Sequence, residues 1–203
     1  MVPFAGWEMP VQFSGLIQEH KAVRERMGMF DISHMGVLRL EGPKPKDALQ
    51  QLVPTDLHRI GPGEACYTVL LNDRGGIRDD LIVYDRGALD ADRGSLVLVI
   101  NAACADNDTA WIRERMEPAG LTVTDSKADG VLLALQGPQA IPLLERLSGS
   151  DLSGLPRFGH RDLTLEGLSQ PVFTARTGYT GEDGAELLLS AADGPKFLSL
   201  IHI

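Results

Sequence analysis

The sequence has 203 residues, enough for one large domain or two small ones with a sizeable core. Its charged fraction of 23% is typical of globular proteins, and its net charge of −9, without any run of lysines and arginines, argues against nucleic acid as a partner. No apolar run reaches the roughly 18 residues that span a bilayer, so we expect no membrane insertion.

The two cysteines, Cys66 and Cys104, form no CxxC motif, so neither a disulfide framework nor a thiolate zinc site is indicated. A reducing compartment fits this pattern. We expect the cytoplasm, with the mitochondrial matrix as the alternative, because the first residues lack the basic and apolar stretches of a signal peptide. The stretch MVPFAGWEMP begins within a motif and GPKFLSLIHI stops inside an apolar segment, so we expect a fragment.

Hydrophobic periodicity and turn residues predict a mixed series of elements along the chain. The first is a helix over residues 14–28, with Ser14 and Gly28 as its caps. The others are strands at 35–42, 65–71, 77–84, 95–101, 121–125, 131–137, 171–177 and 185–190, and helices at 44–53, 104–116 and 138–147, the last with Pro138 in its first turn. Hairpins and helices do not alternate strictly, which indicates an α+β fold. We find no clean linker and expect intertwined domains over residues 1–203, with a subdomain inserted at about 44–125.

The hairpin ACYTVLL–NDRGG–IRDDLIVY contains two adjacent aspartates in a strand, where aspartate is depleted. Side chains alternate along a strand, so its residues divide between two faces. One face carries Ile77, Asp79, Leu81 and Val83, and the other carries Arg78, Asp80, Ile82 and Tyr84. Asp80 beside Ile82 and Tyr84 could place a carboxylate against a polar atom of a flat ring. The alternative is a hairpin edge with solvated acids or an Arg78–Asp79 surface pair.

A second acidic stretch, RTGYTGEDGAELLL (176–189), combines a glycine-rich turn with a strand. The glycines allow a sharp turn and a close approach to a ligand. Glu186 precedes three leucines, and a buried carboxylate can accept two parallel hydrogen bonds. It would suit a heterocycle with adjacent N–H and amino groups, such as a pterin. The alternative is an acidic hairpin turn without a ligand.

Other common sites are not indicated. The five histidines have no HxH or HxxxH spacing, so no metal site is expected. Neither LNDRGG nor TGYTGEDG matches a phosphate-binding loop, and Ser33 lies in no GxSxG motif.

Five stretches together resemble one family: PFAGWEMPVQF, GMFDISHMG, PTDLHRIGPGEACYTVLLNDRGGIRDDLIVY, VLLALQGPQA and RTGYTGEDGAEL. They are similar in order and spacing, from residue 3 to about 190, to the aminomethyltransferase (T-protein) family of the glycine cleavage system. The resemblance implies an enzyme that transfers the aminomethyl carbon from the lipoyl arm of H-protein to tetrahydrofolate. Its products are 5,10-methylenetetrahydrofolate and ammonia. Tetrahydrofolate is a co-substrate, and no metal is implied.

The resemblance also implies residue roles. The catalytic acid falls on Asp80, and the pterin-holding carboxylate falls on Glu186. Further folate contacts fall on Met35, Tyr67, Tyr84, Asn101 and Tyr179.

The resemblance also marks where this chain differs from the family. Members have a further C-terminal barrel-like domain with arginine contacts to folate, so we expect this shorter chain to bind folate poorly or to be inactive. Two alternatives share the fold: a non-enzymatic folate-binding module that assists iron–sulfur proteins, and folate-dependent demethylase relatives. The retained Asp80 favours the aminomethyltransferase.

Overall fold

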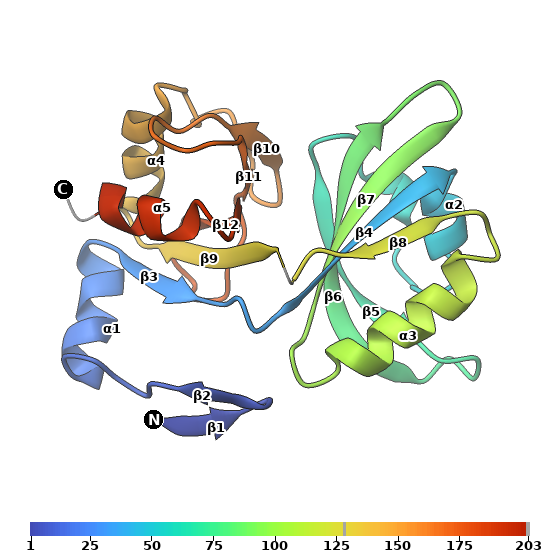
Figure 1. The fold of residues 1–203 in the computed structure, drawn as a ribbon, viewed down its shortest axis with the longest axis horizontal. Coiled ribbons are helices and arrows are strands. Elements are labelled where there is room, and N and C mark those ends of the chain that lie inside the picture. Colours follow the sequence, from blue (N-terminus) through green and yellow to red (C-terminus); the bar gives the residue numbers. More distant parts are fainter. Residues whose placement is uncertain (128, 202–203) are drawn as a thin grey trace. The chain divides into compact units, whose positions relative to one another are not determined.

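The computed structural model describes residues 1–127 and 129–201. Strands and helices are mixed without regular alternation, which confirms the predicted α+β class. The chain divides into two compact units, one formed by Met1–His34 with Asp129–Ile203 and the other by Met35–Ala128 (Figure 1). None of the helices in the described ranges has the length and apolar character needed to cross a membrane.

The first unit contains a five-stranded antiparallel sheet of order β10-β11-β12-β9-β3 and a separate two-stranded hairpin. The hairpin and sheet strands are β1 (Val2–Phe4), β2 (Trp7–Met9), β3 (Gly28–Asp31), β9 (Gly130–Gln136), β10 (His160–Leu163), β11 (Val172–Ala175) and β12 (Gly184–Ser190). The helices are α1 (Leu16–Glu25), α4 (Ala140–Ser148) and α5 (Gly194–Ile201). Alternate residues of β9 and β12, such as Leu133 and Leu187, form a buried core with Leu144 of α4 and Phe197 of α5.

Helix α1 differs from the prediction at both ends. The predicted Ser14 cap is wrong: Gly15 precedes the helix, and Glu19 in its first turn accepts hydrogen bonds from the backbone N–H groups of Phe13, Ser14 and Gly15 at 2.7, 2.7 and 2.9 Å. These bonds, led by that from Gly15, lower the pKa of Glu19. The helix ends at Glu25, and Gly28 instead opens β3. A short strand paired with a distant one has no local signal that sequence periodicity can detect.

The second unit is a five-stranded antiparallel sheet of order β5-β6-β7-β4-β8 (Figure 1). Its elements are β4 (Gly36–Pro43), α2 (Pro45–Leu49), the 3-10 turn η1 (Leu57–Arg59), β5 (Ala65–Leu71), β6 (Ile77–Ala88), β7 (Arg93–Ile100), α3 (Ala105–Met116) and β8 (Thr122–Asp125). Leu81 and Val83 of β6 lie in a core that includes Leu49 of α2 and Ile112 of α3. The two helices therefore cover one face of the sheet, and burial of each such aliphatic side chain contributes about 1.5–3 kcal/mol.

The β5–β6 hairpin forms where predicted. The backbone N–H of Asn72 donates to the carbonyl of Gly76, and the Asn72 side chain accepts from the N–H groups of Arg74 and Gly76. Gly75 takes a φ of 75°, a conformation that suits glycine. Local turn chemistry therefore specifies this hairpin.

A β-bulge at Arg78 interrupts the predicted alternation. Leu70 pairs with Asp79 and Leu71 pairs with Ile77, so Arg78 is an extra residue in the ladder. The Arg78 guanidinium lies over the ring of Trp111 of α3, on the core side, so the prediction that it shares a face with Asp80 is wrong.

Helix 138–147 is confirmed, but it begins at Ala140, so Pro138 lies before its first turn.

Candidate functional site

The face of β6 that points away from α2 and α3 carries Asp80, as alternation predicts. Val69 pairs with Asp80, Tyr67 pairs with Ile82, and Tyr84 lies two residues further along β6. Residues opposite one another in a ladder share a face, so these side chains lie together on the face away from α2 and α3. Tyr84 is fully buried and Tyr67 is 48% exposed.

Two side chains hold the Asp80 carboxyl group. Asn101 follows Ile100, which pairs with Leu81, so it lies beside Asp80 on the neighbouring strand end. Its Nδ2 donates to Oδ1 of Asp80 at 2.8 Å and to the backbone carbonyl of Asp80 at 3.1 Å. The Tyr67 hydroxyl is also hydrogen-bonded to the Asp80 carboxylate. Asp80 is therefore a half-buried carboxylate with a fixed orientation.

The charge of this carboxylate affects its neighbour. The hydrogen bond to Asp80 raises the pKa of Tyr67 above its ordinary value of 10.0, and desolvation and the negative charges of Asp80 and Asp79 add to the effect. Tyr67 therefore stays a neutral hydrogen-bond donor at physiological pH.

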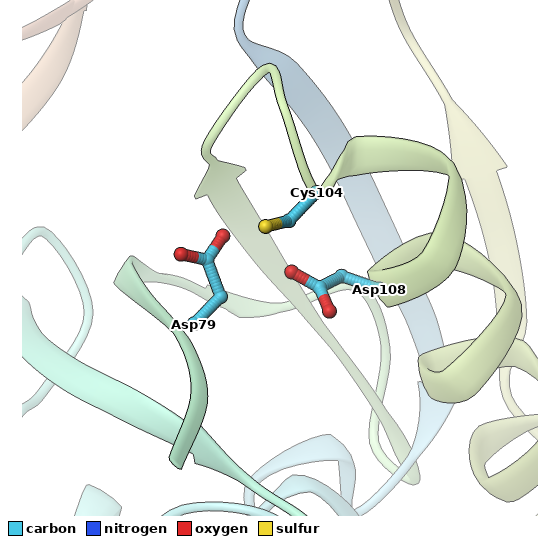
Figure 2. Close-up of side chains that lie close together, drawn as sticks. All are labelled: Asp79, Cys104 and Asp108. Atoms are coloured by element: carbon cyan, nitrogen blue, oxygen red, sulfur yellow. The ribbon is translucent and has the colours of Figure 1, made fainter.

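Two more acids lie behind Asp80, on the core side of the sheet. Figure 2 shows the side chains of Asp79, Cys104 and Asp108 turned toward one another, with one ligand-type atom of each within 4.8 Å of the others. Asp108 is only 2% exposed. Desolvation, followed by the hydrogen bond and charge of Asp79, raises the pKa of Asp108 to about 6, against the opposing effect of Arg78.

The spacing of these three groups alone could admit a metal ion, but two observations disfavour one. The Arg78 guanidinium already lies beside Asp108, with Nε 3.7 Å from Oδ1. Desolvation raises the pKa of the Cys104 thiol, and a protonated thiol is a poor ligand. We interpret Asp79 and Asp108 as a carboxyl pair.

Glu186 lies in the first unit, on β12. It is 6% exposed, and its register partners on both sides are alanines, Ala134 and Ala175. The Thr177 hydroxyl donates to Oε2 of Glu186 at 2.6 Å. Because the core side of β12 carries Leu187, Glu186 points to the opposite face, between two small side chains. This arrangement leaves the carboxylate flanked by little side-chain bulk.

The glycine-rich turn before β12 is closed by ion pairs and close packing. Arg176 donates from Nε and Nη2 to the two carboxylate oxygens of Asp183 at 2.9 and 2.6 Å. Gly178 has a φ of 153°, and a Cβ there would overlap the side-chain amide of Gln136. Gln136 in turn donates to the carbonyl of Thr177 at 3.0 Å. The glycine is therefore required by backbone conformation and by a close approach.

Tyr179, in the same turn, is 72% exposed. With Thr180 it lines a cavity of about 820 Å³ whose other walls are the β1–β2 hairpin, α1 and β3. Glu186 is not among the residues that line this cavity.

The structure thus brings together part of the predicted set within each unit. In the second unit Tyr67 and Asn101 each contact Asp80, Tyr84 lies on the same face of β6, and Met35 is half-buried just before β4. Glu186 and Tyr179 belong to the first unit. Sequence reasoning missed Thr177, Asp108 and Cys104 as neighbours of the predicted acids; a buried first-turn aspartate carries no distinguishing signal.

The comparisons with known proteins agree with this geometry. The family model described as the GCVT N-terminal domain matches residues 1–202. The chain belongs to this family. The resemblance drawn from the sequence motifs is therefore confirmed.

Several aminomethyltransferases share high sequence identity with this GCVT N-terminal domain. It is 86% identical to the aminomethyltransferase of Synechococcus sp. strain CC9902 over 194 residues, which cover 96% of the chain and 53% of the relative. It is 82% identical to that of Parasynechococcus marenigrum strain WH8102 over 201 residues, which cover 99% and 55%. The chain spans about half the length of the curated relatives it matches.

Solved structures show the same fold. The glycine cleavage system aminomethyltransferase T from Bartonella henselae superposes with a TM-score of 0.85 at 36% identity, over 98% of this chain and 52% of that one. The heterotetrameric sarcosine oxidase from Corynebacterium sp. U-96 superposes with a TM-score of 0.61 at 15% identity, over 91% of this chain and 87% of that one, which shows a shared fold alone.

Proposed function

We propose that the protein formed by this chain transfers the aminomethyl carbon from the lipoyl arm of H-protein to tetrahydrofolate. The products are 5,10-methylenetetrahydrofolate and ammonia. The observation that carries the proposal is the carboxylate of Asp80, fixed by Tyr67 and Asn101 on the face of the sheet away from α2 and α3. The relatives named aminomethyltransferase support it.

Asp80 is the proposed catalytic acid. The reaction joins the folate amine to a one-carbon unit on which positive charge develops. A fixed carboxylate can accept a hydrogen bond from the amine and stabilise that charge, and it does not have to reorient at the moment of reaction. The hydrogen bonds from Tyr67 and Asn101 supply this fixed orientation.

Glu186 is the proposed partner of the pterin ring. An ionised carboxylate can accept two parallel hydrogen bonds from adjacent N–H and amino groups. Its register partners on both sides are the small residues Ala134 and Ala175, and the Thr177 hydroxyl donates to one of its oxygens. Met35, Tyr84 and Tyr179 are proposed as further ring contacts.

The proposed chemistry uses no metal ion, because proximity and a fixed carboxylate suffice for the transfer. We place the protein in the cytoplasm, in keeping with the two free cysteines and the cyanobacterial relatives.

The test replaces Asp80 by asparagine in the full-length gene product. Asp80→Asn keeps the shape of the side chain, so tetrahydrofolate affinity should stay within about tenfold, or about 1.4 kcal/mol. Turnover with lipoylated H-protein should fall by about 100-fold or more. Asp73→Asn, an exposed acid at the tip of the same hairpin, is the matched control.

Equal losses of affinity and turnover would remove Asp80 from the catalytic role. A wild-type protein that binds tetrahydrofolate but shows no turnover would instead favour the non-enzymatic folate-binding module.

A further inference from the structure

The two buried acids behind Asp80, which are Asp79 and Asp108, do not contact the reacting groups in the proposed reaction. Asp79 and Asp108 lie on the core side of the sheet, where burial of charge is unfavourable unless it is compensated (Figure 2). Within residues 1–127 and 129–201, no donor reaches Oδ2 of either carboxyl group. At and below its pKa of about 6, protonated Asp108 can supply that donor to Asp79, since a protonated carboxyl group donates and an ionised one accepts.

Asn101 connects this pair to Asp80. Its Nδ2 donates to Oδ1 of Asp79 at 2.9 Å and to Oδ1 of Asp80 at 2.8 Å. One amide nitrogen therefore joins a carboxylate on the core side of β6 to a carboxylate on the other side. The orientation of the amide depends on both acceptors.

The pair is itself held from the helix side. Arg78 is placed beside Asp108 by the bulge in β6 and stacks on Trp111, with Cζ 4.3 Å from the ring centroid. Arg115 stacks on the same ring, with Cζ at 3.1 Å. An arginine stacked on the face of tryptophan is a favourable cation–π contact. The bulge and α3 therefore fix the position of Asp108.

We propose that Asp79 and Asp108 form a buried carboxyl pair that holds the Asn101 amide in place and thereby positions the Asp80 carboxylate. Asp79 and Asp108 are positioning residues, because they act on the reaction only through Asn101. The inference rests on the proposed function, in which Asp80 is the catalytic acid.

The charged and titratable groups around the pair come from every element packed against it. They are Arg78 and Asp80 on β6, Tyr67 on β5, Cys104 just before α3, and Arg115 on α3. Arg78 is the cation nearest to Asp108 among these groups and offsets part of the negative charge. Removal of one carboxyl charge should therefore change the titration of the other.

Three substitutions of Asp79 separate positioning from stability in the full-length gene product. Asp79→Asn keeps an acceptor for Asn101 and offers a donor to Asp108. Asp79→Ala removes both, and Asp79→Leu removes both without leaving a cavity. Asp85→Asn changes another buried acid on the same strand, which is ion-paired with Lys46, and serves as the matched control.

We expect Asp79→Ala and Asp79→Leu to lower kcat by about tenfold or more, with the KM for tetrahydrofolate within about twofold. Asp79→Asn should retain kcat within about threefold, which is rescue by the conservative variant. The control should lower stability but not kcat.

Tyr67 provides a readout that does not require activity. The pKa of Tyr67, followed by NMR of ring-labelled tyrosine and assigned with Tyr67→Phe, reports its hydrogen bond to Asp80. All three variants remove the charge of Asp79, so this charge effect on the Tyr67 pKa is the same in each. If Asp80 is displaced in the alanine and leucine variants, their Tyr67 pKa should be lower than that of Asp79→Asn. In Asp79→Asn, the pKa of Asp108 should fall toward its ordinary value, and this can be measured even where the other variants fail to fold.

The inference is overturned if the alanine and leucine variants have wild-type kcat and the same Tyr67 pKa as Asp79→Asn. It is also overturned if the pKa of Asp108 is the same in Asp79→Asn as in wild type. Its failure is distinct from that of the proposed function. If only the inference fails, Asp80→Asn still abolishes turnover. If the proposed function fails, Asp80→Asn keeps turnover.

Discussion

Replacement of Asp108 by asparagine should stabilise the protein at neutral pH. The pKa of Asp108 rises from an ordinary value of 3.8 to about 6 in the folded protein, mainly because burial penalises the charged form. A difference of about two pKa units corresponds to about 3 kcal/mol, which we take as an upper limit. Asparagine has nearly the same shape but cannot ionise, so this unfavourable contribution disappears.

The pH dependence has a defined sign. An acid whose folded-state pKa is raised destabilises the fold once it is forced to ionise, so stability falls as pH rises from about 4 to about 6. Urea unfolding should therefore give similar free energies for wild type and Asp108→Asn near pH 4. Above about pH 6.5 the variant should be more stable by up to about 3 kcal/mol.

Asp106→Asn is the matched control, since Asp106 is exposed in the first turn of the same helix. Its stability difference from wild type should stay within about 0.5 kcal/mol across the same range. A difference for Asp108→Asn that does not grow between pH 4 and pH 7 would refute the carboxyl pair.

Three further outcomes follow from the site geometry. Glu186→Ala should weaken tetrahydrofolate binding by about tenfold or more, with a smaller effect on kcat, as calorimetry and turnover assays can show; an unchanged affinity would contradict its pterin role. Tyr67→Phe should lower kcat by about tenfold through loss of the hydrogen bond to Asp80, while wild-type kcat would show that the bond is dispensable. Gly178→Ala should cost at least about 2 kcal/mol by thermal unfolding, because the new Cβ would overlap Gln136 in a strained backbone, whereas Gly154→Ala, with open space around it, should be close to neutral.

The sequence predicted the hairpin best because its signals are local. Alternating residues on β5 and β6 and the Asn72–Gly76 turn specify strand, register and turn without reference to the rest of the chain. The same alternation placed Asp80 correctly with Tyr84. It failed at Arg78, since a bulge depends on what the extra residue contacts, here Asp108 and Trp111 on a helix about 30 residues later.

The surroundings of the predicted acids were harder to find. Asp108 lies in the first turn of α3, where an acid is favourable at the surface because of the helix dipole, so its burial is not evident from the sequence. The predicted folate contact of Asn101 stays a prediction; the structure adds that its amide nitrogen donates to Asp79 and Asp80, which the sequence did not indicate. Such contacts depend on strand register and helix packing, which composition and spacing do not encode.

The most direct measurement is a crystal structure of the full-length gene product with tetrahydrofolate. We expect one carboxylate oxygen of Asp80 within about 2.6–3.2 Å of a folate amine nitrogen. A bound folate with no amine nitrogen in contact with Asp80 would contradict the proposed role.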